Sequence, residues 1–233
     1  MLSIADALAK TKDRVVLAGV TAFEGLFPME ESRLSTAMRD YLDDVCQAVD
    51  ILLAREILPR PFFISAGGSA AFDIIVDSFQ GRWKAAKVIL RSGCYITHDH
   101  GMYAKTSPLR EDLVGSRGLR AAFELWSYAQ SCPEPQVVFL TFGRRDAPYD
   151  YGLPRPLFVY CPTTGQHRDL DGAVIEHLND HHARLRIPEG CEVNVGDMVV
   201  CGSSHPCAAF DRWRLIPLID DNTVVVDAIL TYF

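Results

Sequence analysis

A histidine and a cysteine that lie two residues apart near the C-terminus are the residues best suited to chemistry in this sequence. They are His205 and Cys207, in the segment Ser-Ser-His-Pro-Cys. Side chains alternate along an extended segment, so the imidazole and the thiol project from the same side. This pair of donors suits a zinc-type ion, and two protein ligands leave positions open for substrate or water. The pattern predicts a catalytic metal site.

Two glycine-containing turns follow predicted strands in the first half of the chain. They are Ser65-Ala-Gly-Gly-Ser69, which precedes a predicted helix, and Ser92-Gly-Cys-Tyr95. Glycines let the backbone approach a bound group, and the N–H groups at a helix N-terminus favour a phosphate. If the two strands are parallel, both turns lie at one end of the sheet and can bind the same anion. The alternative for the first turn is a tight connection with Ser69 as the helix N-cap.

Three polar segments are further candidates. Thr97-His-Asp-His-Gly-Met-Tyr103 could bind a metal, form a wall of the active site, or be a solvated loop. Asn179-Asp-His-His182 could supply a third metal ligand or a substrate contact, or simply end an element with exposed histidines. Phe142–Pro154 is dense in turns and charges, and its alternative is a surface ion-pair cluster.

The elements that must position these residues alternate in the first half of the chain. Apolar runs predict strands at 14–20, 61–65 and 87–91. Helical spacing predicts helices at 31–55, with Ser32 or Ser35 as N-cap, and at 70–79. Strands that alternate with helices over short connections predict a parallel sheet with helical crossovers.

The second half reads mostly as β-structure after one predicted helix at 119–131. The strand-like segments that follow, broken by Pro and Gly, are 137–141, 157–160, 183–187, 198–201, 214–218 and 223–226. This pattern predicts a β-barrel or sandwich. We therefore divide the chain into domains at 1–120 and 121–233.

Composition narrows the class of protein. The chain has 233 residues, is 48% hydrophobic and 23% charged, and carries a net charge of −7, which argues against nucleic acid or an anionic membrane as partner. No stretch has the length of a signal-peptide core or a membrane span, so a cytoplasmic protein is expected. The seven cysteines are scattered without a Cys-x-x-Cys pair, which favours reduced thiols.

Taken in order, these segments resemble the metal-dependent D-serine dehydratase / D-threonine aldolase-like family, pyridoxal-phosphate enzymes with an alanine racemase-like fold. The resemblance covers nearly the whole chain and rests on Leu17-Ala-Gly-Val, Glu24-Gly25, the two glycine turns, His98-Asp-His-Gly, Asp150-Tyr-Gly-Leu-Pro, Leu178-Asn-Asp-His-His, Ser204-His-Pro-Cys and Phe210-Asp-Arg-Trp-Arg. It implies a fold class of α/β plus all-β, the C-terminal part of a (β/α) barrel followed by a β-barrel or sandwich domain.

The resemblance also implies roles for individual residues. His205 and Cys207 would bind zinc, His182 would lie near the substrate or metal, and Asp99 and Tyr103 would line the catalytic pocket. The cofactor phosphate would be held by Ser65, Gly67, Gly68, Ser69, Gly93, Cys94 and Tyr95. The implied reaction removes the α-proton and the metal-polarised β-hydroxyl of D-serine or a related β-hydroxy-D-amino acid, giving a 2-oxo acid and ammonia.

The cofactor lysine is where the sequence departs from the family. The family places it on an early barrel strand, before the segment that resembles Leu17-Ala-Gly-Val. Lys10 and Lys12 lack a family-like context, and Lys84, Lys87 and Lys105 match no cofactor-lysine motif. The expectation is a chain without the first half of the barrel, paired as a homodimer or with a missing N-terminal half.

Two other functions stay open. One is a D-threonine aldolase-like activity, although the soft Cys207 ligand favours zinc and with it the dehydratase. The other is a truncated member that lacks the cofactor lysine and binds metal or phosphate without turnover.

Overall fold

The structure, a computed structural model, describes residues 2–11, 14–27 and 35–232 and divides into two compact units. The first unit is Met1–Tyr95 with Thr106–Gly118, and the second is Ile96–Lys105 with Leu119–Phe233. The sequence placed 96–105 with the first domain, but the backbone of this segment bonds to residues 122, 203 and 204. Ser32 and Lys12 lie outside the described residues.

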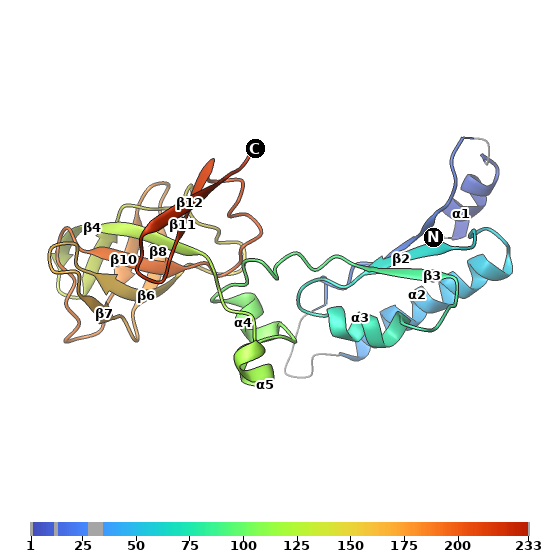
Figure 1. Cartoon of the computed structure of the whole chain (residues 1–233), viewed down its shortest axis with the longest axis horizontal. Helices are drawn as coiled ribbons and strands as arrows, with labels where there is room; N and C mark the ends of the chain where they lie inside the picture. The colour runs from blue at the N-terminus through green and yellow to red at the C-terminus, as the bar shows by residue number, and fades with distance from the viewer. Residues whose placement is uncertain (1, 12–13, 28–34, 233) are drawn as a thin grey trace. The chain divides into compact units, whose positions relative to one another are not determined.

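A three-stranded parallel sheet forms the first unit (Figure 1). Its strands, in spatial order, are β1 (Gly19–Thr21), β2 (Phe62–Ala66) and β3 (Ala86–Leu90). The helices of this unit are α1 (Leu2–Ala9), α2 (Thr36–Ala54), α3 (Phe72–Phe79) and the short α5 (Glu111–Val114), which runs into the 3₁₀ turn Gly115–Arg117. The predicted parallel strands with helical crossovers are confirmed.

Helix α2 begins where a capping serine predicts it. The Met38 N–H donates to the Ser35 hydroxyl over 3.2 Å, which satisfies one of the unpaired donors of the first turn. Apolar residues at helical spacing, among them Leu42 and Val49, are buried against β2 residues such as Ile64. This packing fixes α2 across one face of the sheet.

The strand predicted at 14–20 is wrong for most of its length. Only Gly19–Thr21 pairs with β2, and Val15 and Val16 are 50% and 70% exposed. The Ala18 carbonyl still accepts from the Phe63 N–H over 3.0 Å. However, β2 begins just after Pro61, which has no N–H to donate, so the ladder does not extend back to Val15 and Val16. An apolar run alone does not specify a strand.

The second unit contains a seven-stranded antiparallel sheet with the order β7-β6-β10-β4-β5-β9-β8. The strands are β4 (Glu124–Glu134), β5 (Val137–Leu140), β6 (Arg155–Tyr160), β7 (His167–Asp169), β8 (Val174–Leu178), β9 (Ala183–Arg186) and β10 (Met198–Gly202). The sheet curls, since β6 contacts β8, and it encloses an apolar core. A helix, α4 (Met102–Thr106), and a hairpin of β11 (Leu215–Ile219) and β12 (Val225–Leu230) complete the described part.

The helix predicted at 119–131 is wrong, because this segment enters strand β4. Ser127 and Ala129 are buried on one side of β4, and Trp126 packs edge-on against Phe158 on the other. β4 pairs with β10 on one side and β5 on the other. The tertiary pairing therefore overrides the local helical spacing. The fold is a partial barrel followed by a sheet domain, as the sequence predicted.

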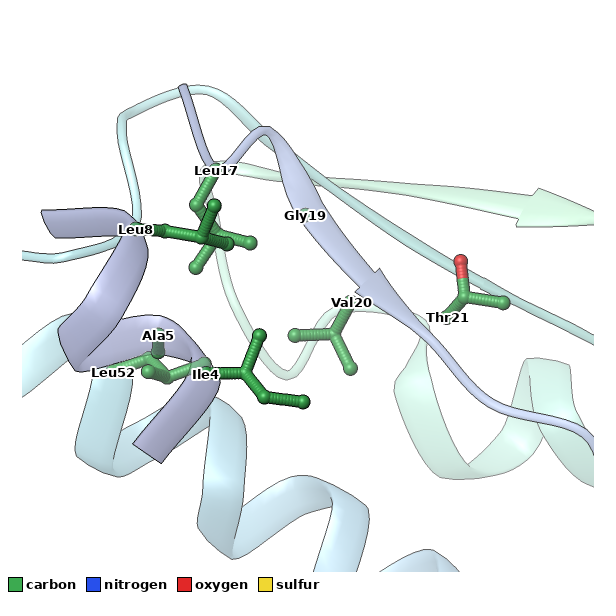
Figure 2. A pocket seen from close by; sticks show the side chains of 8 residues that line it. All are labelled: Ile4, Ala5, Leu8, Leu17, Gly19, Val20, Thr21 and Leu52. Atoms are coloured by element: carbon green, nitrogen blue, oxygen red, sulfur yellow. The ribbon is translucent and has the colours of Figure 1, made fainter. Parts of the chain in front are cut away.

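A small apolar pocket lies between α1 and β1 in the first unit (Figure 2). Its lining residues are Ile4, Ala5, Leu8, Leu17, Gly19, Val20, Thr21 and Leu52. Apart from Thr21, the side chains that line this pocket are apolar or absent, and none of the predicted site residues is among them. None of the described helices is long and apolar enough to cross a membrane.

Candidate functional site

The two predicted phosphate loops are joined to each other at the carboxyl ends of β2 and β3. The Ser92 hydroxyl donates to the Gly67 carbonyl over 2.7 Å, and the Cys94 N–H donates to the Ser69 hydroxyl over 3.1 Å. Gly67 has a φ of +86°, and a Cβ there would lie 2.7 Å from Leu90 Cδ2, so this position requires glycine. The loops form one hydrogen-bonded unit.

Ser69 is not the N-cap of the helix that follows, so this alternative is wrong. Helix α3 begins at Phe72, and its N-cap Ala71 makes no side-chain capping bond. Ser69 is buried and accepts from the next loop instead. The serine therefore connects the two loops.

Glu24 is a residue of this site that sequence reasoning did not assign. It follows β1 and is 2% exposed, and its carboxylate accepts from the Gly67 N–H over 3.3 Å and, in a short bond, from the Gly68 N–H. Two donors that the sequence assigned to a phosphate thus bind a carboxylate of the protein itself. The available signal was topological, since Glu24 lies at the carboxyl end of a parallel strand, as the two glycine loops do.

The remaining predicted cofactor residues lie at the same ends of the strands. Ser65 is half-buried and pairs with Thr21 and Ile89 in the sheet. Among the residues that the structure describes, and apart from its chain neighbours, nothing lies within 4 Å of a Cβ built on Gly93. Tyr95 is 40% exposed and packs edge-on against Phe72 at 5.6 Å. The open space beside Gly93, close to the hydroxyl-bearing loop of Ser69, fits an anion such as the phosphate of the predicted cofactor.

His205, in the second unit, is buried and held in one orientation by a carboxylate. Its Nδ1 lies 2.6 Å from Asp150 Oδ2, and its ring packs against Tyr151 at 4.7 Å and Tyr103 at 5.8 Å. The carboxylate acceptor assigns the proton to Nδ1 and leaves Nε2 as the lone-pair nitrogen. A histidine oriented in this way by a carboxylate is typical of a metal ligand.

Cys207 is exposed, two residues beyond His205. In the part of the chain that the structure describes, no three His, Cys, Asp or Glu side chains are close enough together to hold a metal. An imidazole and a thiol suit zinc, so the donor chemistry fits this ion, while the pair of ligands stays a prediction.

In the segment His98–Tyr103, the side chains of His98, Asp99 and Tyr103 are buried and the other three residues are half-buried, so the solvated-loop alternative is wrong. Asp99 is 2% exposed and accepts from the Gly101, Tyr103 and Ala104 N–H groups at 2.9, 2.9 and 3.1 Å. Its oxygens therefore cap α4, and its predicted catalytic role stays a prediction. Tyr103 lies against the His205 ring, so the structure brings these two predicted residues together.

Backbone hydrogen bonds attach this segment to Ser203 and Ser204, next to the predicted metal ligand His205. The His100 N–H donates to the Ser203 carbonyl and the Met102 N–H to the Ser204 carbonyl, each over 2.9 Å. Among the described residues, His100 Nδ1 is a buried atom without a hydrogen-bond partner. Burial lowers the pKa values of both His98 and His100.

His182 is exposed, and the described ring contacts of His205 are with tyrosines only. The segment around His182 instead supports a neighbouring loop, since Arg144 N–H donates to the Asn179 carbonyl over 2.8 Å. A Cβ on Gly143 would lie 2.5 Å from the Asp180 carbonyl carbon. The role of His182 beside substrate or metal stays a prediction.

The Phe142–Pro154 loop has an exposed ion pair, Arg145 with Asp180 at 4.0 Å, and is also held by side chains that donate to its backbone carbonyls. Arg212 Nη1 donates to the Arg144 carbonyl and Trp213 Nε1 to the Asp146 carbonyl, each over 2.8 Å. This loop carries Asp150, so the Phe210–Trp213 segment stabilises the residue that orients His205. No local pattern in the sequence indicates this pairing of distant segments.

Comparisons with known proteins first define the class of fold. A D-threonine aldolase from Filomicrobium marinum matches with a TM-score of 0.66 and 17% identity over 92% of this chain and 53% of its own. D-threo-3-hydroxyaspartate dehydratase from Delftia sp. HT23 matches with a TM-score of 0.59 and 16% identity, over 93% of this chain and 56% of its own. An alanine racemase-like protein from Idiomarina loihiensis matches with a TM-score of 0.62 and 14% identity, over 98% of this chain and 59% of its own. At these identities the likeness establishes an alanine racemase-like fold.

The family model then narrows the class. Residues 122–219 match the model described as "Putative serine dehydratase domain". This range contains Asp150 and His205. The resemblance to the D-serine dehydratase / D-threonine aldolase-like family is thereby confirmed. The chain spans 53% to 59% of the length of the three solved structures above. No curated protein sequence matches the chain.

Proposed function

We propose that this chain carries the phosphate-binding and metal-binding sites of a pyridoxal-phosphate- and zinc-dependent lyase. Its substrate is D-serine or a related β-hydroxy-D-amino acid, and its products are a 2-oxo acid and ammonia. The observation that carries the proposal is the pair of Asp150 and buried His205 at 2.6 Å, inside the range that matches the serine dehydratase model.

The residues of the second unit would hold and tune the metal. The Nδ1–H of His205 donates a hydrogen bond to Asp150, which fixes the ring and makes Nε2 a better ligand. Cys207 would add a soft thiolate, which favours zinc over manganese or magnesium. His205 and Cys207 would thereby hold a zinc ion, which would supply a Lewis acid for the β-hydroxyl leaving group. The rings of Tyr103 and Tyr151 shield His205 from water.

The residues of the first unit would hold the cofactor by its phosphate. Gly93 leaves open space beside the loops, and Ser69 and Cys94 tie the loops together. Pyridoxal phosphate, when bound, supplies the electron sink for α-proton removal. The same proposal includes assembly of the chain as a homodimer and a D-amino acid as its substrate.

Turnover of D-serine tests the lyase. The full chain is incubated with pyridoxal phosphate, zinc and D-serine, and pyruvate is followed by a coupled assay. We expect pyruvate formation that a chelator stops and that zinc restores. His205→Ala should abolish it, whereas His177→Ala, at an exposed histidine, should not. Glycine and acetaldehyde from D-threonine would favour the aldolase instead.

One observation favours the non-catalytic alternative. Lys10, Lys84, Lys87 and Lys105 are all exposed, and Lys12 lies outside the described residues. Borohydride reduction with pyridoxal phosphate, followed by mass spectrometry, separates the two functions. Labelling of one lysine supports the lyase, and scattered or absent labelling supports a member without turnover.

A further inference from the structure

Glu24 has an arrangement that the proposed reaction does not use. Its carboxylate is 2% exposed, and its two oxygens accept from the N–H groups of the consecutive residues Gly67 and Gly68. Consecutive N–H groups that converge in this way form a nest that binds anions. The anion in this nest is the protein's own side chain.

The hydrogen bonds of Glu24 continue into the third strand. The Gly67 carbonyl accepts from the Ser92 hydroxyl over 2.7 Å and from the Arg91 N–H over 3.1 Å. The Arg91 guanidinium donates to the Ala22 carbonyl over 2.6 Å, close to Glu24 in the chain. The carboxyl ends of β1, β2 and β3 are therefore bound into one network, with the Gly67–Gly68 turn at its centre.

We infer that Glu24 is a positioning residue for the phosphate site: it fixes the Gly67–Gly68 turn, and the phosphate binds at the neighbouring Ser69 and Gly93. This inference rests on the pyridoxal-phosphate part of the proposed function. Like charges repel, so a phosphate does not share the two N–H groups that hold the carboxylate. Charge-assisted bonds to a buried carboxylate are strong and keep the turn in one conformation.

The opposite role for Glu24 makes a different prediction. If its carboxylate merely blocked the nest, its removal would free two donors and strengthen phosphate binding. If it positions the loops, its removal lets the turn move, and with it Ser92 and the open space beside Gly93. The sign of the change in phosphate affinity separates the two roles.

The test compares Glu24→Ala, Glu24→Gln and Glu24→Asp in the full chain, with Asp77→Asn as control. Asp77 is an exposed carboxylate of the same unit. Each protein is titrated with pyridoxal phosphate and with pyridoxal, which lacks the phosphate. We expect Glu24→Ala and Glu24→Gln to weaken pyridoxal-phosphate binding on the order of tenfold, because charge-assisted bonds that fix the site are lost. Pyridoxal binding and the control should be unchanged.

Glu24→Asp keeps the charge on a shorter side chain and should fall between the wild type and Glu24→Gln. Unchanged or stronger pyridoxal-phosphate binding in Glu24→Gln overturns the inference. A wild type that does not distinguish pyridoxal phosphate from pyridoxal overturns the proposed function, and the inference with it.

Amide hydrogen exchange, measured without cofactor, reports how firmly Glu24 holds the Gly67–Gly68 turn. We expect faster exchange across residues 66–70 in Glu24→Gln, with the α2 segment 36–54 unchanged. Equal exchange in the mutant and the wild type would contradict the positioning role even if phosphate affinity fell. This measurement also decides the matter if Glu24→Ala fails to fold.

Discussion

Two carboxylates act through other groups in this protein. Asp150 holds the ring of His205 at 2.6 Å, and Glu24 holds the N–H groups of Gly67 and Gly68. Neither side chain needs to touch a ligand to influence binding. Their effects are therefore best measured as changes in affinity of the groups that they orient.

Asp150→Asn should weaken zinc binding about 10- to 100-fold, because an outer partner that orients a histidine ligand is lost. Competition with a chelating dye measures the affinity. Asp171→Asn, at an exposed aspartate, is the control and should match the wild type. An unchanged zinc affinity in Asp150→Asn would mean that His205 is not a metal ligand.

Stability should fall as the pH is lowered through the ordinary histidine range. Burial lowers the pKa of His100 in the folded state, and likewise that of His98. The unfolded chain therefore binds more protons as the pH falls below about 6.5, so unfolding becomes easier. Below the depressed folded pKa values the loss levels off. Urea unfolding between about pH 7.5 and pH 5.5 tests this, and a flat profile would contradict it.

For single residues, the sequence supplied candidates for the site but not the partners that hold them. His205, Cys207 and the two glycine loops could be found because each is a short local pattern. Asp150 lies 55 positions from His205, and Glu24 lies 43 positions from Gly67. Such pairs form only when the chain folds, so a single sequence does not reveal them.

Close contact between two segments positions the loop that carries the proposed metal ligands His205 and Cys207. A Cβ on Gly101 would lie 2.7 Å from the Cα of Ser204, next to His205. Gly101→Ala should therefore push the two segments apart and cost roughly 1–3 kcal/mol in the free energy of unfolding. Zinc affinity should fall in the same variant. Denaturant unfolding and dye competition measure both, and wild-type values in both would contradict this role of Gly101.

Helices and strands with a strong local signal were predicted well. The α2 pattern with its Ser35 cap and the buried run of β2 both lie close to their predicted ranges. The helix predicted at 119–131 failed because Ala121, Ala122, Leu125 and Trp126 have helix-like spacing, whereas β4 is stabilised by strands on both sides. The short polar strand β7 carries too little periodicity to be predicted.

The two candidate sites belong to different compact units of the chain. The phosphate loops lie in the first unit, and Asp150 and His205 lie in the second. The sequence predicted both candidate sites, but it placed residues 96–105 in the first domain. A single sequence does not show the backbone bonds that join residues 96–105 to residues 203 and 204 of the second unit.

Ligands should protect the two units separately. Hydrogen exchange should slow at 66–70 and 92–95 on addition of pyridoxal phosphate, and at 150–152 and 203–207 on addition of zinc. Binding stabilises the segments that hold the ligand against local opening. Protection by zinc at other segments, with none at 203–207, would contradict the assignment.

The account depends most on a metal held by His205 and Cys207, and cobalt substitution tests this directly. Cobalt reports its ligands in its absorption spectrum, and a thiolate ligand adds a charge-transfer band. We expect this band in the wild type, its loss in Cys207→Ser, and loss of binding in His205→Ala. A cobalt spectrum that is the same in the wild type and in both variants would contradict the account.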